Sequence, residues 1–343
     1  MQNKVVVNMP LLDETGNLSE PGWSTDLVWD YHRDDIKANK LRIKEWDYYL
    51  IYNQDIALAL TIADNSYMGL ISASVINFKA RKEKTSSVMT LFPKGKFNLP
   101  ETSKTGNSVF KNEKVEMRFL NDGKTRKLFF NYPNFEGTST LSGEIELTKQ
   151  PEDSMVIATP FTKNKHFYYN QKIVGFRADG YLVLGNKKVE FLSRNTFAIL
   201  DWGRGVWTYK NTWYWGGGAG QINGVDFGFN IGYGFGDTSK ATENILFYNG
   251  VAHKLSQVKF NIPKTADGKD DYLSPWTFTS DDGRFEMAFA PILNRSAYTS
   301  AVVVKSRQNQ VFGKYTGKAI LDDGTVLQVK DFLGFAEKVF NKW

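Results

Sequence analysis

Asp-Gly dipeptides punctuate this chain and narrow the folds that it can adopt. They separate runs rich in β-branched and aromatic residues, such as KLFFNY and SAVVVKS. An Asp-Gly pair tolerates the positive φ angles of a tight turn, so this pattern is typical of β-hairpins. Helical periodicity is limited to Leu27–Ile36 and Phe335–Phe340. The sequence therefore predicts an all-β fold with minor helices. The five pairs are Asp122-Gly123, Asp179-Gly180, Asp267-Gly268, Asp282-Gly283 and Asp323-Gly324.

The amino-acid composition limits the kinds of functional site that the protein can contain. The 343 residues are 41% hydrophobic and 15% aromatic and include no cysteine. A packed globular protein is therefore expected, without disulfides, thiolate catalysis or cysteine-based metal sites. His32, His166 and His253 lie far apart in the sequence, so we expect no metal centre. The glycine-rich stretch lacks the strand–turn–helix context of a dinucleotide site, and we expect no cofactor.

The charge pattern bears on partners and location. The net charge is +6, and basic residues are spread along the chain, with the densest cluster at Arg81, Lys82 and Lys84. A nucleic-acid-binding protein usually concentrates such residues, so no nucleic-acid partner is expected. The N-terminal residues do not resemble a signal peptide, and no apolar run is long enough for an integral membrane segment. These features favour a cytoplasmic protein. They leave the oligomeric state open.

The two halves of the chain echo each other. Trp46 opens the run WDYYLIYNQDIALALTIAD, and Trp213 opens a similar, glycine-rich run; Asp64 then matches Asp237. Similar segments in the same order indicate an internal duplication, with chance similarity of short hairpins as the alternative. We predict two domains, residues 1–190 and 191–343. Each has the length and the short strands of an antiparallel up-and-down barrel, which closes its edges and encloses a cavity.

The segment from Phe197 to His253 contains the candidate site. Four tryptophans, interleaved with glycines, either line an apolar pocket and stabilise a cation or simply fill the core. They are Trp202, Trp207, Trp213 and Trp215. Asp201 follows an apolar run, and burial there would raise its pKa and suit a general acid. The alternative for Asp201 is a turn cap or an ion pair with Arg204.

Further polar residues of this segment are candidates for the same site. Arg204 could hold a ligand carboxylate or could bridge strands. His253 could carry protons. Glu243 is a second candidate acid, in a polar loop that is otherwise a solvated turn. The ligand-binding candidates are completed by Tyr233, Asp237 and Asn244.

Several motifs resemble a known family. The segments DWGRGVW and GDTSKATEN, together with PLLDETGNLSEPGW near the start and the closing LDDGTVLQVKDFLGFAEKVFNKW, resemble the bacterial family catalogued as domain of unknown function 2804. More distantly, the chain resembles the two-domain lipocalin-like proteins, which include carotenoid hydratases of the hydroxyneurosporene synthase type and AttH-like proteins. The resemblance implies two tandem lipocalin-like β-barrels and an apolar ligand near their junction.

The hydratases also suggest roles for individual residues. In them, an aspartate protonates a carbon–carbon double bond, and aromatic rings stabilise the resulting cation. The resemblance places Asp201 at the aspartate position and Trp213 and Trp215 at a W-x-W pair. Ile199 stands two residues before Asp201, where an aromatic residue would match the hydratase pattern.

These observations lead to two hypotheses of function. The first is binding of a hydrophobic small molecule of isoprenoid, fatty acyl or polyketide-like type. The alternative is a cofactor-free hydratase, cyclase or isomerase with Asp201 as general acid, and with Glu243 and His253 as further catalytic candidates. A scaffold with an exposed aromatic patch is a third class, which would lack a closed pocket.

Overall fold

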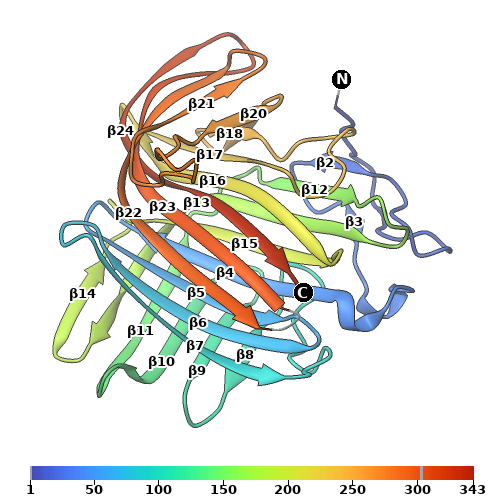
Figure 1. The fold of residues 1–343 in the computed structure, drawn as a ribbon, viewed down its shortest axis with the longest axis horizontal. Coiled ribbons are helices and arrows are strands. Elements are labelled where there is room, and N and C mark those ends of the chain that lie inside the picture. The colour runs from blue at the N-terminus through green and yellow to red at the C-terminus, as the bar shows by residue number, and fades with distance from the viewer. Residues whose placement is uncertain (1, 302–303) are drawn as a thin grey trace.

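Two curled β-sheets lie against each other and form almost the whole molecule (Figure 1). The computed structural model describes residues 2–301 and 304–343. Within them, the strands form a 13-stranded sheet, a 9-stranded sheet and one short parallel pair. All other named strand pairs are antiparallel, which confirms the predicted all-β, lipocalin-like fold.

The first sheet runs in the order β7-β6-β5-β4-β15-β13-β11-β10-β9-β8, and β2, β12 and β14 attach to it. Its strands are β2 (Gly22–Ser24), β4 (Ile43–Tyr52), β5 (Ile56–Asp64), β6 (Met68–Asn77), β7 (Lys82–Leu91), β8 (Ser108–Lys111), β9 (Glu116–Asn121), β10 (Arg126–Glu136), β11 (Ser139–Thr148), β12 (Met155–Pro160), β13 (Phe167–Leu184), β14 (Lys187–Phe191) and β15 (Phe197–Val206). Along this path, β7 and β8 remain edges, so the sheet is a half-barrel rather than a closed barrel.

The second sheet runs in the order β19-β18-β17-β16-β24-β23-β22-β21-β20. Its strands are β16 (Lys210–Ile222), β17 (Val225–Tyr233), β18 (Ile245–Tyr248), β19 (Val251–Lys254), β20 (Val258–Asn261), β21 (Trp276–Ser280), β22 (Phe285–Ala301), β23 (Val304–Ile320) and β24 (Val326–Lys342). The parallel pair joins β1 (Met9–Pro10) and β3 (Trp29–Asp30).

The two sheets repeat one topology. In the first, β4 begins a four-strand meander, and the last strand, β15, returns to pair with β4. In the second, β16 begins a meander, and β24 returns to pair with β16. The division into domains stays a prediction. A boundary at residue 190 separates β15 from the sheet in which it pairs, because the chain changes sheets only after Val206.

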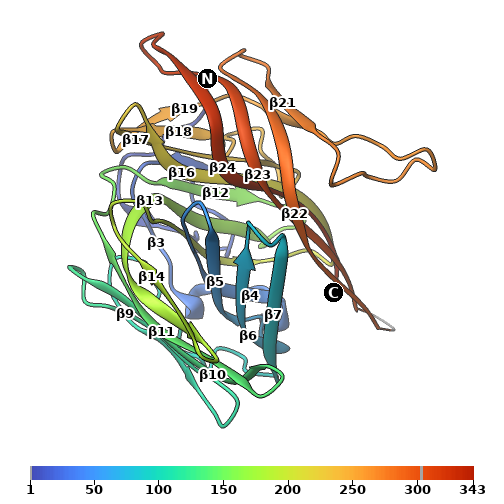
Figure 2. The ribbon, with the colours of Figure 1, turned by 90° about the vertical axis from the view of Figure 1, so that its left-hand side faces the viewer.

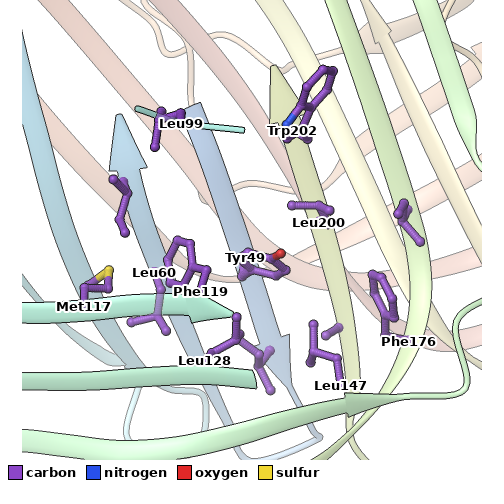
Figure 3. Packing of buried hydrophobic residues seen from close by; sticks show 14 of the residues in the cluster. Tyr49, Leu60, Leu99, Met117, Phe119, Leu128, Leu147, Phe176, Leu200 and Trp202 are labelled. Carbon is purple, nitrogen blue, oxygen red and sulfur yellow. The ribbon is translucent and has the colours of Figure 1, made fainter. Parts of the chain in front are cut away.

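Three layers of apolar side chains stack through the molecule. The first core fills the concave side of the first sheet, where Tyr49, Phe119, Leu128 and Leu200 point toward one another (Figure 3). The second core lies within the curl of the second sheet. Between them lies the junction core, to which the two sheets contribute Tyr48, Leu50, Tyr52, Tyr168, Val174, Phe197, Ile199, Trp215, Ala219, Phe312, Leu333 and Phe335. Strands β4, β13 and β15 are therefore largely buried on both faces, which explains why apolar and aromatic residues occur on both faces of each strand.

The glycines of β16 make room for aromatic rings in the second core. A Cβ atom at Gly218 would lie 3.0 Å from ring carbons of both Phe229 and Phe332. Tyr315 packs on Phe229, with ring centroids 4.9 Å apart. The second core is thus filled by side chains, and the glycine-rich strand is explained by packing rather than by an enclosed barrel cavity.

Three local predictions were wrong. Phe335–Phe340 is not helical but lies in β24, because pairing with β16 and β23 overrides the local pattern. Within Leu27–Ile36 only the 3₁₀ turn η1 (Arg33–Asp35) forms, and a second such turn, η2 (Lys40–Arg42), precedes β4. Asp179-Gly180 is not a turn but part of β13, paired with β11. Among the described residues, no helix is long and apolar enough to span a membrane.

Candidate functional site

The DWGRG motif lies on β15, where strand alternation divides it between two cores. Side chains of a strand point alternately to opposite faces. Trp202 and Arg204 therefore point toward the first core, and Asp201, Gly203 and Gly205 face the junction core. Gly203 pairs with Trp46 on β4, and a Cβ atom at position 203 would overlap the Trp46 ring. The motif thus places the Asp201 carboxyl next to the glycine backbone at position 203, on which the Trp46 indole ring packs.

This packing gives a first prediction. We expect Gly203→Ala to lower the free energy of unfolding by about 1–3 kcal/mol, because the added methyl forces the Trp46 ring out of place. Urea denaturation followed by far-UV circular dichroism measures the change. The same substitution made in a Trp46→Ala background serves as the control. If alanine at 203 were equally costly without the ring, the overlap would not be the cause.

Asp201 is held by two neighbours on β13. The Lys172 ammonium lies 2.8 Å from Asp201 Oδ1, and Asn170 Nδ2 donates to the same oxygen at 2.6 Å. The side chains of Lys172 and Asp201 are 3% and 11% exposed. Lys172 Nζ also lies 3.9 Å from the ring centroid of Trp215 on the second sheet. Lys172 therefore connects the carboxylate of one sheet to the aromatic face of the other.

A row of paired residues on the second sheet lies opposite. Arg295, Gln310, Glu337 and Trp215 are successive partners across β22, β23, β24 and β16. Gln310 Nε2 donates to Glu337 at 3.1 Å, and Trp213 Nε1 donates to the other carboxyl oxygen at 3.0 Å. Glu337 is 4% exposed, and burial raises its pKa to about 7 despite these donors and the nearby charges of Arg295 and Lys172.

Glu243 adds a third carboxyl to the cluster. Its side chain lies over the backbone of Gly232, the partner of Trp215, and Asn230 Nδ2 donates to its backbone oxygen at 2.9 Å. Burial of the carboxyl raises the pKa of Glu243, and the nearby Lys172 opposes that rise. Asp201, Glu243 and Glu337 thus surround one lysine at the junction of the sheets.

Aromatic rings enclose the same region. Phe235 packs edge-on against Trp207, Trp213 and Tyr168, with centroid distances of 4.7, 5.2 and 4.9 Å. Trp46 stacks on Tyr168 at 6.2 Å. The carboxyl and lysine groups are therefore enclosed by side chains that exclude water, where electrostatic interactions are stronger than at the surface.

Some buried polar atoms of this cluster lack hydrogen-bond partners. Asn170 Oδ1 and Gln310 Oε1 accept no hydrogen bond from the described residues, and the Tyr48 hydroxyl has no hydrogen-bond partner among them, although the Gln310 side chain lies beside it. Tyr48 pairs with Asp201 on the neighbouring strand and packs on Trp215. Buried polar groups are normally satisfied, so a set of unsatisfied ones in one place indicates capacity for a ligand or for ordered water.

A cavity of about 150 Å³ opens at the edge of the junction. Its apolar lining includes Val174, Phe197, Phe227 and Phe247, with Asp226 among the charged residues beside them. Val174 and Phe197 lie on the same strands as Lys172 and Asp201 and belong to the junction core. The cavity and the polar cluster therefore lie along the same surface of β13 and β15, with Ile199 between them.

Other predicted site residues lie apart from this cluster. Arg204 is fully buried on the first-core side, where it donates to the backbone oxygens of Trp46 (2.9 Å) and Pro100 (2.6 Å) and pairs with Asp47 at 3.1 Å. Its guanidinium lies over Trp202. These contacts match the strand-bridging alternative for Arg204 and place Trp202 in the first core.

The remaining candidates hold the second sheet and its loops together. Tyr233 stacks on Tyr214 in the second core, with centroids 4.4 Å apart. Asp237 is exposed and accepts from the Ser239 backbone, which lowers its pKa. Asn244 accepts from the Gly232 backbone at 2.7 Å. His253 lies beside Asp322, where its ring accepts from the Asp322 backbone. The structure thus brings together Asp201, Glu243, Trp207, Trp213 and Trp215.

Sequence reasoning missed the groups that complete the cluster. Lys172 is a lone charge within the aromatic and aliphatic run YYNQKIVGF, and this irregularity was a usable signal. Glu337 was obscured because its segment was predicted to be helical. Tyr48 and Gln310 carry no local signal, since only strand pairing brings them to the site. Within residues 2–301 and 304–343, no group of His, Asp and Glu is arranged to hold a metal ion.

Two solved structures align with most of this chain. An AttH-like protein from Nitrosomonas europaea aligns with a TM-score of 0.57 at 13% identity, covering 96% of this chain and 98% of that one. Kievitone hydratase from Nectria haematococca aligns with a TM-score of 0.45 at 10% identity, covering 88% of each chain. No curated protein matches the sequence. The first likeness shows a common arrangement of the two sheets.

The sequence also matches a family model along its length. The model described as Domain of unknown function (DUF2804) covers residues 2–343. This match includes the DWGRG strand, the Lys172 strand and the Glu337 strand that build the junction cluster. The chain therefore belongs to the DUF2804 family.

Proposed function

We propose that the protein binds an apolar small molecule bearing a polar group between its two sheets. The observation that carries this proposal is the set of unsatisfied polar atoms within an aromatic enclosure: Tyr48 Oη, Asn170 Oδ1 and Gln310 Oε1. An apolar enclosure with a few convergent polar groups is the usual composition of a small-molecule site. The adjoining cavity offers apolar surface for the body of the ligand, and the row around Tyr48 offers partners for its polar end.

Exchange of a single hydroxyl tests this binding mode. We expect Tyr48→Phe to weaken binding of retinol, farnesol or oleate about five- to tenfold, because one hydrogen bond to the polar end is lost. Tryptophan fluorescence titration measures the affinity, and native mass spectrometry gives the stoichiometry. Tyr49→Phe is the matched control, since Tyr49 is the next residue of β4 and points into the first core.

Two results would contradict the proposal. One is the absence of binding for all three probes. The other is an equal loss of affinity in Tyr48→Phe and Tyr49→Phe, which would place the ligand away from the junction.

Proton transfer to the bound ligand is the second candidate function, as in a cofactor-free hydratase, cyclase or isomerase. It is favoured by the pKa of about 7 for the Glu337 carboxyl, which lies in the range useful to a general acid at neutral pH. Asp201 instead accepts from Lys172 and Asn170, so in this proposal it orients the ammonium and stabilises a developing positive charge. The aromatic faces of Trp213 and Trp215 would support the same charge.

Deuterium incorporation tests this candidate without knowledge of the product. Incubation of retinol or farnesol with the protein in deuterium oxide should place deuterium on a former alkene carbon, because the π bond takes up the deuteron and the resulting cation either adds water or loses a proton from a neighbouring carbon. Glu337→Gln should abolish incorporation, while Glu144→Gln, at an exposed position on β11, should leave it unchanged. Equal incorporation with all three proteins would exclude Glu337 as the donor.

A further inference from the structure

A basic face occupies the end of the second sheet, away from the junction. Lys305, Lys342 and Lys210 are successive cross-strand partners on β23, β24 and β16. Arg307 lies two residues along β23 on the same face, and pairs with Tyr298 and Phe340. These residues lie far apart in the sequence, and only strand pairing brings them together. We call Lys210, Lys305, Arg307 and Lys342 the basic row.

The end of the sheet that carries the basic row projects beyond its neighbours. β17 pairs with β16 only as far as Tyr214, and β21 pairs with β22 only as far as Phe289. Beyond these points β16, β22, β23 and β24 continue as a four-stranded ribbon, whose end near the C-terminus extends past the rest of the sheet (Figure 2). Trp213 and Gln310 occupy the other face, toward the junction. The basic row therefore lies on the face turned away from the first sheet.

The charges of the basic row are uncompensated within the described part of the chain. None of the four residues forms an ion pair there, whereas Lys338, on the same face, pairs with Asp270 at 2.6 Å. Like charges placed directly opposite each other across strands destabilise a sheet. Beside the row, a hydrogen bond with Ser300 lowers the pKa of Tyr298, and a hydrogen bond with Arg307 and the charges of Lys305 and Arg307 lower it further. An anionic partner that neutralises these positive charges would explain why they are placed next to each other.

We propose that the basic row docks the protein on an anionic lipid surface. Each positively charged side chain near such a surface contributes favourably, and tyrosine is common at the membrane–water interface. Tyr298 is 62% exposed beside the row. The proposal concerns peripheral contact through side chains, and it is independent of what binds between the sheets.

The geometry favours a lipid surface over other anions. The basic groups lie over different rings: Lys210 over Phe340, Arg307 over Tyr298 and Lys342 over Tyr209. Because these groups are held over separate rings, they lie side by side along the strand ends instead of converging on one point, as a site for a single phosphate would require. Their placement also covers ring faces on which nucleobases would stack in a single-stranded nucleic-acid site. Distributed charge suits a surface of many separate headgroups.

Vesicle sedimentation tests the proposal with the full chain. We expect binding to phosphatidylcholine vesicles that contain about one-third phosphatidylserine, and little binding to phosphatidylcholine alone. The triple variant Lys210→Gln, Lys305→Gln, Lys342→Gln should lower the partition coefficient roughly a hundredfold. High salt should also weaken binding, because the charges of the row are exposed to solvent. Thermal unfolding of the variant checks that it is folded.

A matched variant distinguishes an effect of the basic row from an effect of the net charge of the protein. Lys82→Gln, Lys84→Gln, Lys187→Gln removes three exposed lysines from β7 and β14 and should leave vesicle binding nearly unchanged. The proposal is overturned if the unmodified protein does not bind the anionic vesicles, or if both triple variants lose binding equally. It is also overturned if the first triple variant loses only binding to a single-stranded oligonucleotide, which would assign the face to nucleic acid.

Discussion

Replacing Lys172 with methionine is expected to lower the free energy of unfolding by about 3–5 kcal/mol. In the unmodified protein the Lys172 ammonium lies 2.8 Å from the Asp201 carboxylate. The substitution removes this cation and leaves the carboxylate buried without a charged partner. It also removes the positive charge near the raised-pKa carboxyls of Glu243 and Glu337. Methionine has nearly the same length and fills the space beside Trp215, so loss of packing contributes little. Urea denaturation followed by far-UV circular dichroism measures the effect.

A second substitution identifies the cause. Asp201→Leu, added to Lys172→Met, removes the unpaired charge and should recover most of the lost stability, because a buried ion pair can be exchanged for apolar groups at little cost. Asn170 would lose an acceptor whenever Asp201 is replaced, so Asp201→Leu alone is also measured. A double variant no more stable than Lys172→Met would show that the ion pair is not the source of the effect.

The second large effect is a dependence of stability on pH. The ordinary glutamate pKa is 4.5, and burial raises the pKa of Glu337 to about 7. Folded protein therefore keeps this proton at pH values where unfolded chain has released it. The resulting contribution is fully present below the unfolded pKa and is lost as pH rises from about 4.5 through 7. Glu337→Gln should abolish this loss, making the variant more stable than the unmodified protein at pH 8 by on the order of 3 kcal/mol.

Denaturation at two pH values measures this difference. The advantage of Glu337→Gln should be large at pH 8 and small at pH 5. Glu144→Gln, at an exposed carboxyl on another strand, should behave like the unmodified protein at both values. An advantage of equal size at both pH values would indicate a change in packing rather than a titrating carboxyl.

The sequence predicted the fold class because its signals are local. Asp-Gly pairs mark real turns at Asp122-Gly123, Asp282-Gly283 and Asp323-Gly324, where consecutive strands reverse. Asp179-Gly180 misled because a long strand can contain the same dipeptide. Closure of the barrels was not predictable in this way, since it depends on whether the two edge strands meet.

Only the residues of the candidate site that lie in the segment from Phe197 to His253 could be predicted from the sequence. Asp201, Trp213 and Trp215 share a segment dense in aromatic residues, so local composition pointed to them. Lys172 and Glu337 reach Asp201 through pairing of β13 with β15 and packing of one sheet on the other. The basic row was missed for the same reason, because three isolated lysines in the sequence become neighbours only when β16, β23 and β24 pair.

The short connection between the sheets has a consequence for access to the junction. Residues 207–209 join β15 to β16, and Trp207 exchanges hydrogen bonds with Arg42 just before β4. Trp343 donates to Tyr209 in the same connection. The covalent connection and these hydrogen bonds thus hold the two sheets together at one end of the junction. Any parting of the two sheets at the opposite margin, where Phe197 and Phe227 line the cavity, has to break the ion pairs that Asp226 of the second sheet forms with Lys149 and Arg177 of the first.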